Sequence, residues 1–295
     1  MKKKRYVIAA CALAFLLALG GLAVWFLRSI PPGEEWLSYE SEELIAAIDR
    51  QLEGLDPEGL ARAKEHLVLG QDLETIQRSV ARGDLTYEEL TVLCLYRIKT
   101  LDQRHHGYNS VAAVAPTALE QARAKDRALA ELTAAGQTPA PLFGIPVMLK
   151  DNINTADMPT SAGAQAFSSF FPKEDAPLVE ALRAQGAVIL GKNNLSEFAY
   201  YVSSVMPSGY SGKKGQTMNP FGPRKISPSG SSSGSAVAVA LDLAPVSIGT
   251  ETAGSIVGPA AANSVVGFKP TRDSVPAEGI FPLIRRIDTP NGAEE

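Results

Sequence analysis

Residues 227–240 read SPSGSSSGSAVAVA, a serine- and glycine-rich run that passes directly into small apolar residues. Runs of this composition are usually flexible linkers, because they bury too little apolar surface to offset the entropy of ordering. A linker separates two self-sufficient blocks, however, and here the chain continues at once as AVAVALDLAPVSIGT over residues 236–250. That continuation predicts a buried helix of small residues followed by a buried strand. We therefore expect the serine run to belong to an ordered structure.

The composition is that of a globular protein. The chain has 295 residues, of which 45% are hydrophobic and 20% are charged, enough for one large core or two modest ones. A net charge of -4 gives no electrostatic footprint for a nucleic-acid partner, so this class is excluded. The two cysteines, Cys11 and Cys94, lie in an apolar N-terminal segment and in a predicted helix, which leaves no pair for a disulfide framework.

The N-terminus carries the pattern of a membrane segment. Four basic residues, Lys2 to Arg5, precede an uncharged stretch over residues 6–27 that as a helix spans about 30 Å. A cleaved signal peptide has a shorter apolar region, so residues 1–30 are predicted to be a retained anchor or an uncleaved signal. The basic residues place the N-terminus in the cytoplasm and the rest of the chain outside. We thus expect a membrane-anchored extracytoplasmic protein, secreted if the segment is cleaved; cleavage and lipidation at Cys11 stay open.

The remaining chain changes its pattern near residue 142. Residues 31–67 are predicted to form a tether and a helical extension, and the pattern stays helical from about 40 to 132. Thr86 and Glu89 predict a capping box, and Gly83 is expected to end the preceding helix. Beyond 142, short apolar strands alternate with helical or glycine-rich segments, which favours an α/β sheet with its site at strand ends. The expected strands fall within residues 142–151, 187–192, 243–252 and 264–271.

One serine motif in the opening run can be tested by a count of histidines. Residues 230–234 read GSSSG and satisfy the nucleophile elbow of α/β-hydrolases, with Ser232 as the nucleophile. That fold places its acid and its histidine after the serine, whereas all the histidines here precede it: His66, His105 and His106. The elbow hypothesis therefore fails. No Walker loop and no metal-ligand spacing stands out, so neither cofactor nor metal is expected.

A serine hydrolase without a usable histidine needs another base, and Lys150 is the candidate. It ends the strand-like segment GIPVMLK, in which alternation places Lys150 on one face and Asp151 on the other. A lysine enclosed by a sheet and glycine-rich loops loses the hydration of its charged form, so its pKa is expected to fall toward the range of a general base. The alternative is a surface lysine at the end of a strand.

Six blocks occur along the chain in a fixed order: GIPVMLKDNI, GKNNLSEFAY, GQTMNPFGP, SPSGSSSGSAVAVA, GTETAGSIVGPAA and VVGFKPT. Together they resemble the blocks of the amidase signature family, over roughly residues 68–291. The resemblance implies an α/β fold with a mixed sheet flanked by helices, here following an N-terminal transmembrane helix, with 68–295 as the amidase signature domain. The family's chains usually continue well past residue 291, so the domain is expected to be truncated, with its C-terminal part missing.

The resemblance also implies a catalytic triad. In the family, a lysine, a serine held by a cis peptide bond and a second serine act together, and the matching positions here are Lys150, Ser231 and Ser255. Ser255 is expected to attack the amide carbonyl, Ser231 to relay the proton, and neutral Lys150 to receive it.

The segment before Ser255 is expected to bind the oxyanion. Backbone N–H groups can point at the developing charge, aided by the positive end of a helix from Ile256 onward. The predicted donors are the N–H groups of Thr252, Ala253, Gly254 and Ser255. Two positions depart from the family pattern, because Ser229 stands where glycine is common and Ala253 where glycine or a polar residue is common.

The motif forms are most similar to the bacterial peptide amidase branch, whose members release ammonia from C-terminal amides of peptides. The expected function is therefore hydrolysis of a peptide amide or another small amide. Two alternatives stay open. One is a truncated or inactive membrane-tethered binding protein; the other is an amidotransferase A-type subunit for aminoacyl-tRNA, which the predicted anchor disfavours because that enzyme belongs in the cytosol. The physiological amide and the oligomeric state stay undetermined.

Overall fold

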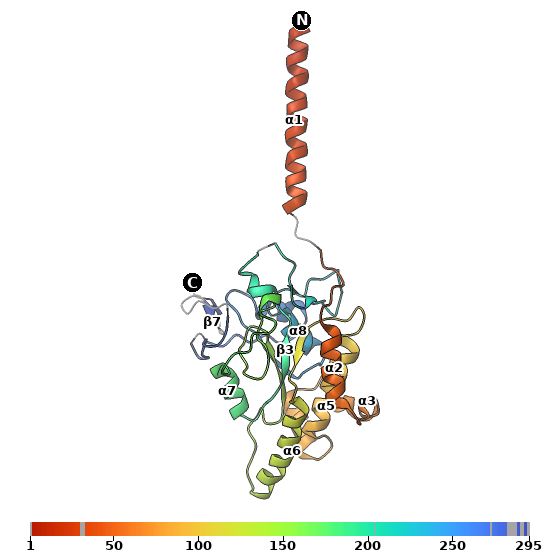
Figure 1. The fold of residues 1–295 in the computed structure, drawn as a ribbon, viewed down its shortest axis with the longest axis vertical. Coiled ribbons are helices and arrows are strands. Elements are labelled where there is room, and N and C mark those ends of the chain that lie inside the picture. Colours follow the sequence, from red (N-terminus) through yellow and green to blue (C-terminus); the bar gives the residue numbers. More distant parts are fainter. Residues whose placement is uncertain are drawn as a thin grey trace.

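The computed structural model describes residues 2–29, 33–203, 205–271, 273–281, 288–289 and 292–293. The long helix α1 (Lys2–Ser29) projects away from a body in which helices surround a sheet (Figure 1). Its segment Cys11–Arg28 is long and apolar enough to cross a membrane and has none of its residues buried, a test that a signal sequence also passes.

Helices pack along one side of the sheet, close to where the sequence predicts them. Thr86 and Glu89 form the capping box at the start of α5: the Thr86 side chain accepts from the Glu89 N–H, and the Glu89 side chain accepts from the Thr86 N–H. Gly83 follows α4 with a φ of +77°, as expected for a helix end. The helices of this part are α2 (Ser41–Leu52), α3 (Pro57–Lys64), α4 (Leu73–Ala81), α5 (Tyr87–Arg97) and α6 (Ala118–Ala134), with short turns η1 (Glu65–Leu67) and η2 (Ile98–Asp102).

The sheet is mixed and has the order β1-β3-β2-β6. Strand β2 (Pro146–Lys150) lies parallel to β3 (Val188–Asn193) on one side and to β6 (Val246–Ile248) on the other. Strand β1 (Val111–Val114) pairs antiparallel with β3 at the edge. The predicted mixed α/β sheet with flanking helices is confirmed. The purely helical pattern expected up to residue 132 is wrong at β1, because four residues (VAAV) are too short to show a period.

The remaining elements lie between or after the strands of this sheet. Strands β4 (Tyr210–Ser211) and β5 (Gly215–Gln216) pair antiparallel in a separate two-stranded hairpin. The pair β7 (Asp288–Thr289) and β8 (Gly292–Ala293) lies near the C-terminus. The other elements are η3 (Gln165–Phe167), α7 (Pro177–Ala184), η4 (Glu197–Tyr200), α8 (Ser233–Ala240) and α9 (Val257–Ala262).

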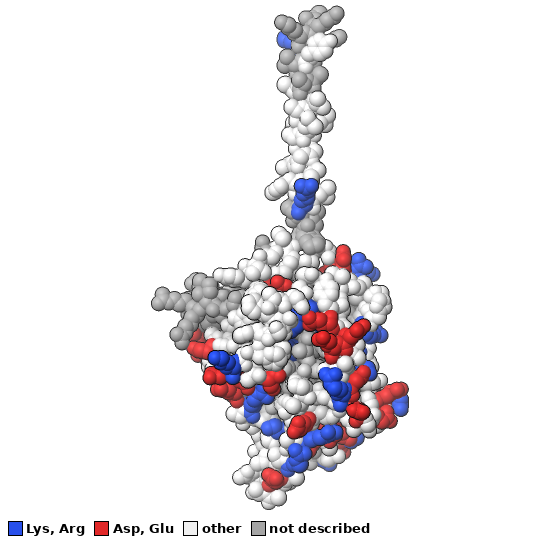
Figure 2. All heavy atoms as spheres, viewed as in Figure 1, with Lys and Arg blue, Asp and Glu red and all other residues white. Residues whose placement is uncertain are grey.

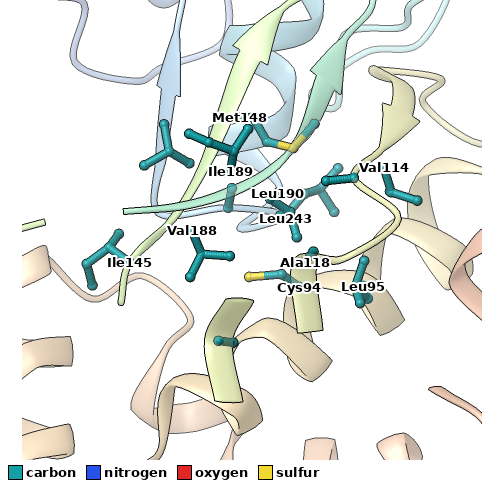
Figure 3. Packing of buried hydrophobic residues seen from close by; sticks show 14 of the residues in the cluster. Cys94, Leu95, Val114, Ala118, Ile145, Met148, Val188, Ile189, Leu190 and Leu243 are labelled. Carbon is teal, nitrogen blue, oxygen red and sulfur yellow. The ribbon is translucent and has the colours of Figure 1, made fainter. Parts of the chain in front are cut away.

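The core forms where α5 and α6 meet the sheet (Figure 3). Cys94 of α5 and Ala118 of α6 lie against buried side chains of β3 such as Val188, and the sheet contributes Met148 from its central strand. Burial raises the pKa of the Cys94 thiol to about 12, so this residue is a neutral part of the core. The sequence-based prediction that Cys94 is a core residue is confirmed.

The serine run is ordered. It leads into α8, of which Ser233 to Ala238 are buried as predicted, and the chain then enters the predicted strand β6, which is half-buried where a buried strand was expected. The alternative of a flexible linker is therefore wrong. Strand β2 is buried on both faces along its whole length, so Lys150 and Asp151 are both enclosed and the surface-lysine alternative is wrong too.

The strand expected within residues 264–271 does not form. This segment is irregular, and Val266 is 97% exposed and Phe268 79% exposed. Among the described residues, β6 is the last strand on this side of the sheet, so no neighbouring strand lies there to pair with the segment. At the end of the region of family resemblance, Ile287 and Pro290 lie outside the described residues.

We expect Gly191→Ala to destabilise the protein by about 1–3 kcal/mol, because a Cβ there would lie 2.2 Å from the Ala113 carbonyl oxygen across the β1–β3 pairing. Urea unfolding followed by circular dichroism measures this loss. The control is Gly33→Ala, where a Cβ has open space around it. Equal unfolding midpoints for the two variants would contradict the close approach of β1 to β3.

Candidate active site

The Lys150 side chain lies at the centre of the site. It ends β2, is completely buried, and places its Nζ 2.7 Å from Ser231 Oγ. The same nitrogen lies 2.9 Å from Thr250 Oγ1 and 3.2 Å from the Thr250 carbonyl oxygen. A neutral amine has two N–H donors and one lone pair, so it can donate to the two Thr250 oxygens and accept from the Ser231 hydroxyl. The arrangement thus suits a lysine that acts as a base.

Burial lowers the pKa of Lys150 from 10.5 to about 7, and the negative charge of Glu251 partly opposes this fall. Two other enclosed lysines, Lys192 and Lys214, have pKa values lowered by burial to about 8. Lys192 donates to the Ile153 carbonyl at 2.5 Å and to the Thr160 hydroxyl at 2.9 Å. Among these three lysines, Lys150 is the one in contact with a hydroxyl of the serine run, and its lowered pKa suits a general base near neutral pH.

The peptide bond between Gly230 and Ser231 is cis, as the resemblance implies. Glycine is required before it, because a Cβ on Gly230 would lie 2.1 Å from Tyr200 Oη and 2.4 Å from Ser196 Oγ. The carbonyl of Ser231 accepts from the Ser196 N–H at 3.1 Å. Ser229 has a φ of +59°, which confirms that its position is one where glycine is favoured. These contacts fix the direction of the Ser231 hydroxyl toward Lys150.

The Ser232 hydroxyl is held by backbone groups. It accepts from the Thr250 N–H at 3.2 Å and donates to the Thr250 carbonyl at 3.0 Å. Its own N–H donates to the Ser255 carbonyl at 3.1 Å, which joins the serine run to the segment that carries Ser255. A hydroxyl engaged in this way is a positioning group, in agreement with the failure of the elbow hypothesis.

Ser255 lies between β6 and α9 and is 9% exposed. The structure therefore brings all three predicted triad residues to neighbouring segments and joins Lys150 to Ser231. Among the hydrogen bonds of the described residues, none joins the hydroxyls of Ser231 and Ser255. The first link of the predicted relay is present, and the second stays a prediction.

Glu251 covers the start of α9. Its Oε2 accepts the N–H groups of Ile256 at 2.7 Å and Val257 at 3.0 Å, and its Oε1 lies 3.6 Å from Lys269 Nζ. Burial raises the pKa of this carboxyl, but these N–H groups and that of Gly254 outweigh it, so the pKa is lowered and Glu251 is charged. Its negative charge offsets the positive helix end that we expected to assist at the oxyanion.

The four N–H groups predicted to bind the oxyanion follow Glu251 directly. Gly254 has a φ of +84°, so this turn depends on glycine, and its N–H already interacts with Glu251. The assignment of Thr252, Ala253, Gly254 and Ser255 as donors stays a prediction.

Sequence reasoning missed two polar neighbours of the lysine. Thr250 supplies two oxygens to Lys150, and Asn152 Nδ2 donates to Thr250 Oγ1 at 3.0 Å. Both residues come two positions after a parallel strand, at the same edge of the sheet, and this signal could have found them. The rings of the neighbouring His105 and His106 lie 3.9 Å apart, and the part of the chain described here holds no group of three possible metal ligands.

Comparison with known proteins agrees with this geometry. A family model described as Amidase matches residues 89–290. The chain is similar to the A subunit of glutamyl-tRNA(Gln) amidotransferase from Mycolicibacterium vanbaalenii, with 39% identity over 74% of this chain and 42% of the relative. It is also similar to a probable amidase of Arabidopsis thaliana, with 42% identity over 74% of this chain and 41% of the relative.

Solved structures are similar too. An amidase family protein of Bacillus anthracis superposes with a TM-score of 0.83 and 45% identity, covering 88% of this chain and 50% of that one. A peptide amidase of Stenotrophomonas maltophilia superposes with a TM-score of 0.70 and 48% identity, covering 75% and 44%. The chain thus spans about half the length of the proteins it matches.

The lowered pKa of Lys150 predicts how stability depends on pH. Between pH 7 and 9 the unfolded chain binds a proton on this lysine that the folded chain does not, so the free energy of unfolding rises with pH. Relative to Lys150→Met, which has no such group, the parent is expected to gain about 2 kcal/mol over this range. Urea titrations at pH 7, 8 and 9 measure the difference. Parallel pH curves for the two proteins would show that Lys150 titrates as an exposed lysine does.

Proposed function

Because this chain belongs to the amidase family, we propose that it hydrolyses a carboxamide C–N bond through an acyl-enzyme on Ser255. One observation carries the proposal: the buried Lys150 amine, with its pKa lowered to about 7, lies 2.7 Å from the Ser231 hydroxyl. A neutral amine in contact with a hydroxyl is the arrangement that activates a serine without histidine.

The proposed acylation begins with proton transfer along this chain of groups. Neutral Lys150 accepts the proton of the Ser231 hydroxyl, Ser231 takes the proton of Ser255, and the Ser255 oxygen attacks the amide carbonyl carbon. The carbonyl oxygen becomes an oxyanion, which the backbone N–H groups of Thr252, Ala253 and Ser255 are proposed to stabilise; the Gly254 N–H would first have to leave the Glu251 carboxylate. Each such donor contributes about 3 kcal/mol to the stability of the transition state.

The intermediate then collapses with cleavage of the C–N bond. The proton held by Lys150 returns through Ser231 to the leaving nitrogen, so a primary carboxamide releases ammonia and leaves an ester on Ser255. Water attacks this ester with the same groups as base and acid, which releases the carboxylic acid and restores the three residues.

For the substrate, we propose the C-terminal amide of a peptide or another small carboxamide. The peptide amidase at 48% identity supports this choice. The amidotransferase relative with 39% identity favours a second candidate, in which the hydrolysed amide belongs to an ammonia donor for tRNA-linked amidation. Peptide amide and free glutamine, supplied as alternative substrates, distinguish the two.

For the location, we propose that α1 anchors the protein in a membrane, with the body on the extracytoplasmic side. The four basic residues before the apolar stretch support this topology. Retention of the protein in membranes after carbonate washing tests the anchor, and full extraction would contradict it.

We expect Ser255→Ala and Lys150→Ala each to lower the release of ammonia from a peptide amide by about 10⁴-fold, as loss of one member of a catalytic triad typically does. The matched control is Ser168→Ala, which removes a serine at the end of η3 and is expected to keep the parent rate. A well-folded parent that releases no ammonia from peptide amide or glutamine would overturn the proposed hydrolysis, and an active Ser255→Ala variant would overturn the assigned nucleophile.

The pH dependence follows from the same lysine. Below its pKa of about 7 Lys150 is protonated and cannot accept a proton, so kcat/KM is expected to rise about tenfold per pH unit up to pH 7 and then to level off. Initial rates between pH 5 and 9 at limiting substrate measure the profile. A rise that continues to pH 10 would mean that the base is a lysine with an ordinary pKa.

A further inference from the structure

Outside the candidate active site, two loops carry a set of exposed apolar side chains. The loops flank the hairpin of β4 and β5, one before it and one after it. The sequence carries no charged residue from 198 to 212. We call these side chains the apolar patch, and they are Tyr201 (68% exposed), Val202 (60%), Val205 (58%), Phe221 (61%) and Ile226 (46%).

The hairpin holds the bases of the two loops side by side. Tyr210 pairs with Gln216, and the Thr217 N–H donates to the Gly209 carbonyl at 2.9 Å. The loop before the hairpin is tied to it again, because Gln216 Nε2 donates to the Ser208 carbonyl at 2.6 Å. The hairpin therefore keeps the bases of the two patch loops next to each other.

The tether from α1 arrives at the same hairpin. The Gln216 N–H donates to the Leu37 carbonyl at 2.9 Å, and the Tyr39 N–H donates to the Lys214 carbonyl at 3.1 Å. Closer to α1, Arg224 Nε donates to the Glu34 carbonyl at 3.2 Å. Arg224 belongs to the second loop of the patch, so the tether and the patch are in direct contact.

Chain length then limits the distance between α1 and the patch. Glu34 comes five positions after Ser29, the last residue of α1, and a fully extended chain of five steps spans at most about 18 Å. Figure 1 shows α1 meeting the body at this end. In Figure 2 the surface nearest to α1 is largely uncharged, whereas most acidic and basic side chains lie farther away.

The second loop also has the charge that an anionic membrane surface attracts. It reads FGPRKI over residues 221–226, with exposed Arg224 and Lys225 between the exposed Phe221 and Ile226. Apolar and aromatic side chains that enter the interfacial layer of a bilayer, next to cations that meet anionic headgroups, are typical of peripheral membrane contacts.

We propose that the apolar patch inserts into the interfacial layer of an anionic bilayer, the same membrane that α1 is proposed to anchor in. The first loop of the patch follows Ser196, whose N–H donates to the Ser231 carbonyl at 3.1 Å. Insertion of the apolar patch would therefore hold the segment that carries Ser231 close to the membrane surface. The proposal rests on the proposed anchor, which carbonate washing tests separately.

The test uses the full chain with a cysteine-reactive NBD fluorophore, in vesicles of phosphatidylcholine and phosphatidylglycerol. Cys11→Ser removes the exposed native thiol, while Cys94 is 1% exposed and does not react. Single labels are placed at Val205→Cys and Phe221→Cys. The matched control is Ala134→Cys, an exposed position at the end of α6, which lies far from α1 in Figure 1.

The fluorescence of each label is quenched by lipids that carry a nitroxide on the acyl chain. This quenching is expected to be at least about twofold stronger at the two patch positions than at the control. The reason is that interfacial side chains lie about 5–10 Å into the headgroup and acyl boundary. Replacing Arg224 and Lys225 by glutamate is expected to reduce this quenching in anionic vesicles and not in purely zwitterionic ones. Equal quenching at patch and control positions would overturn the proposal. The proposal would also be overturned if the labels at the patch were protected from water without vesicles, to an extent that grows with protein concentration. That result would show that a second copy of the chain covers the patch.

Discussion

The desolvation of one ammonium group underlies the proposed chemistry. Lys150 is completely buried at the end of the central strand, where water cannot solvate its charge. The fall of its pKa from 10.5 to about 7 corresponds to about 5 kcal/mol less stabilisation of the charged form than in water. The fold bears this cost because the neutral amine has good partners in Thr250 and Ser231. An ordinary exposed lysine would be protonated at neutral pH and could not act as a base.

The sheet topology brings these partners together. Because β2 and β6 are parallel neighbours, their carboxyl ends meet at one edge, which places Lys150 and Asn152 beside Thr250. The serine run reaches the same edge because its glycines permit close packing. A Cβ on Gly234 would lie 2.4 Å from the carbonyl oxygens of Asn194 and Ser110. The low side-chain volume that first suggests a linker therefore allows the start of α8 to pack against the backbone that flanks β1 and β3.

Part of the candidate site could be predicted from the sequence: Lys150 lies against Ser231 as expected, while the link from Ser231 to Ser255 stays a prediction. Lys150, Ser231 and Ser255 could be assigned because each lies in a distinctive block, and the helices between residues 40 and 132 could be predicted from their periodicity. Strand β1 was missed because four small apolar residues carry no period. Residues 264–271 were predicted to be a strand from their apolar content, but strand formation also needs a neighbouring strand, which a local pattern cannot show. Thr250 was missed because its role depends on the parallel pairing of two distant segments.

The state of the Lys150 amine is the central claim, and it can be observed directly. Nuclear magnetic resonance of protein labelled with ¹³C at the lysine Cε reports the protonation of each side chain, and Lys150→Met identifies the signal that belongs to residue 150. The account predicts that this signal titrates with a midpoint near pH 7. A midpoint near 10.5, the value of a solvated lysine, would contradict it.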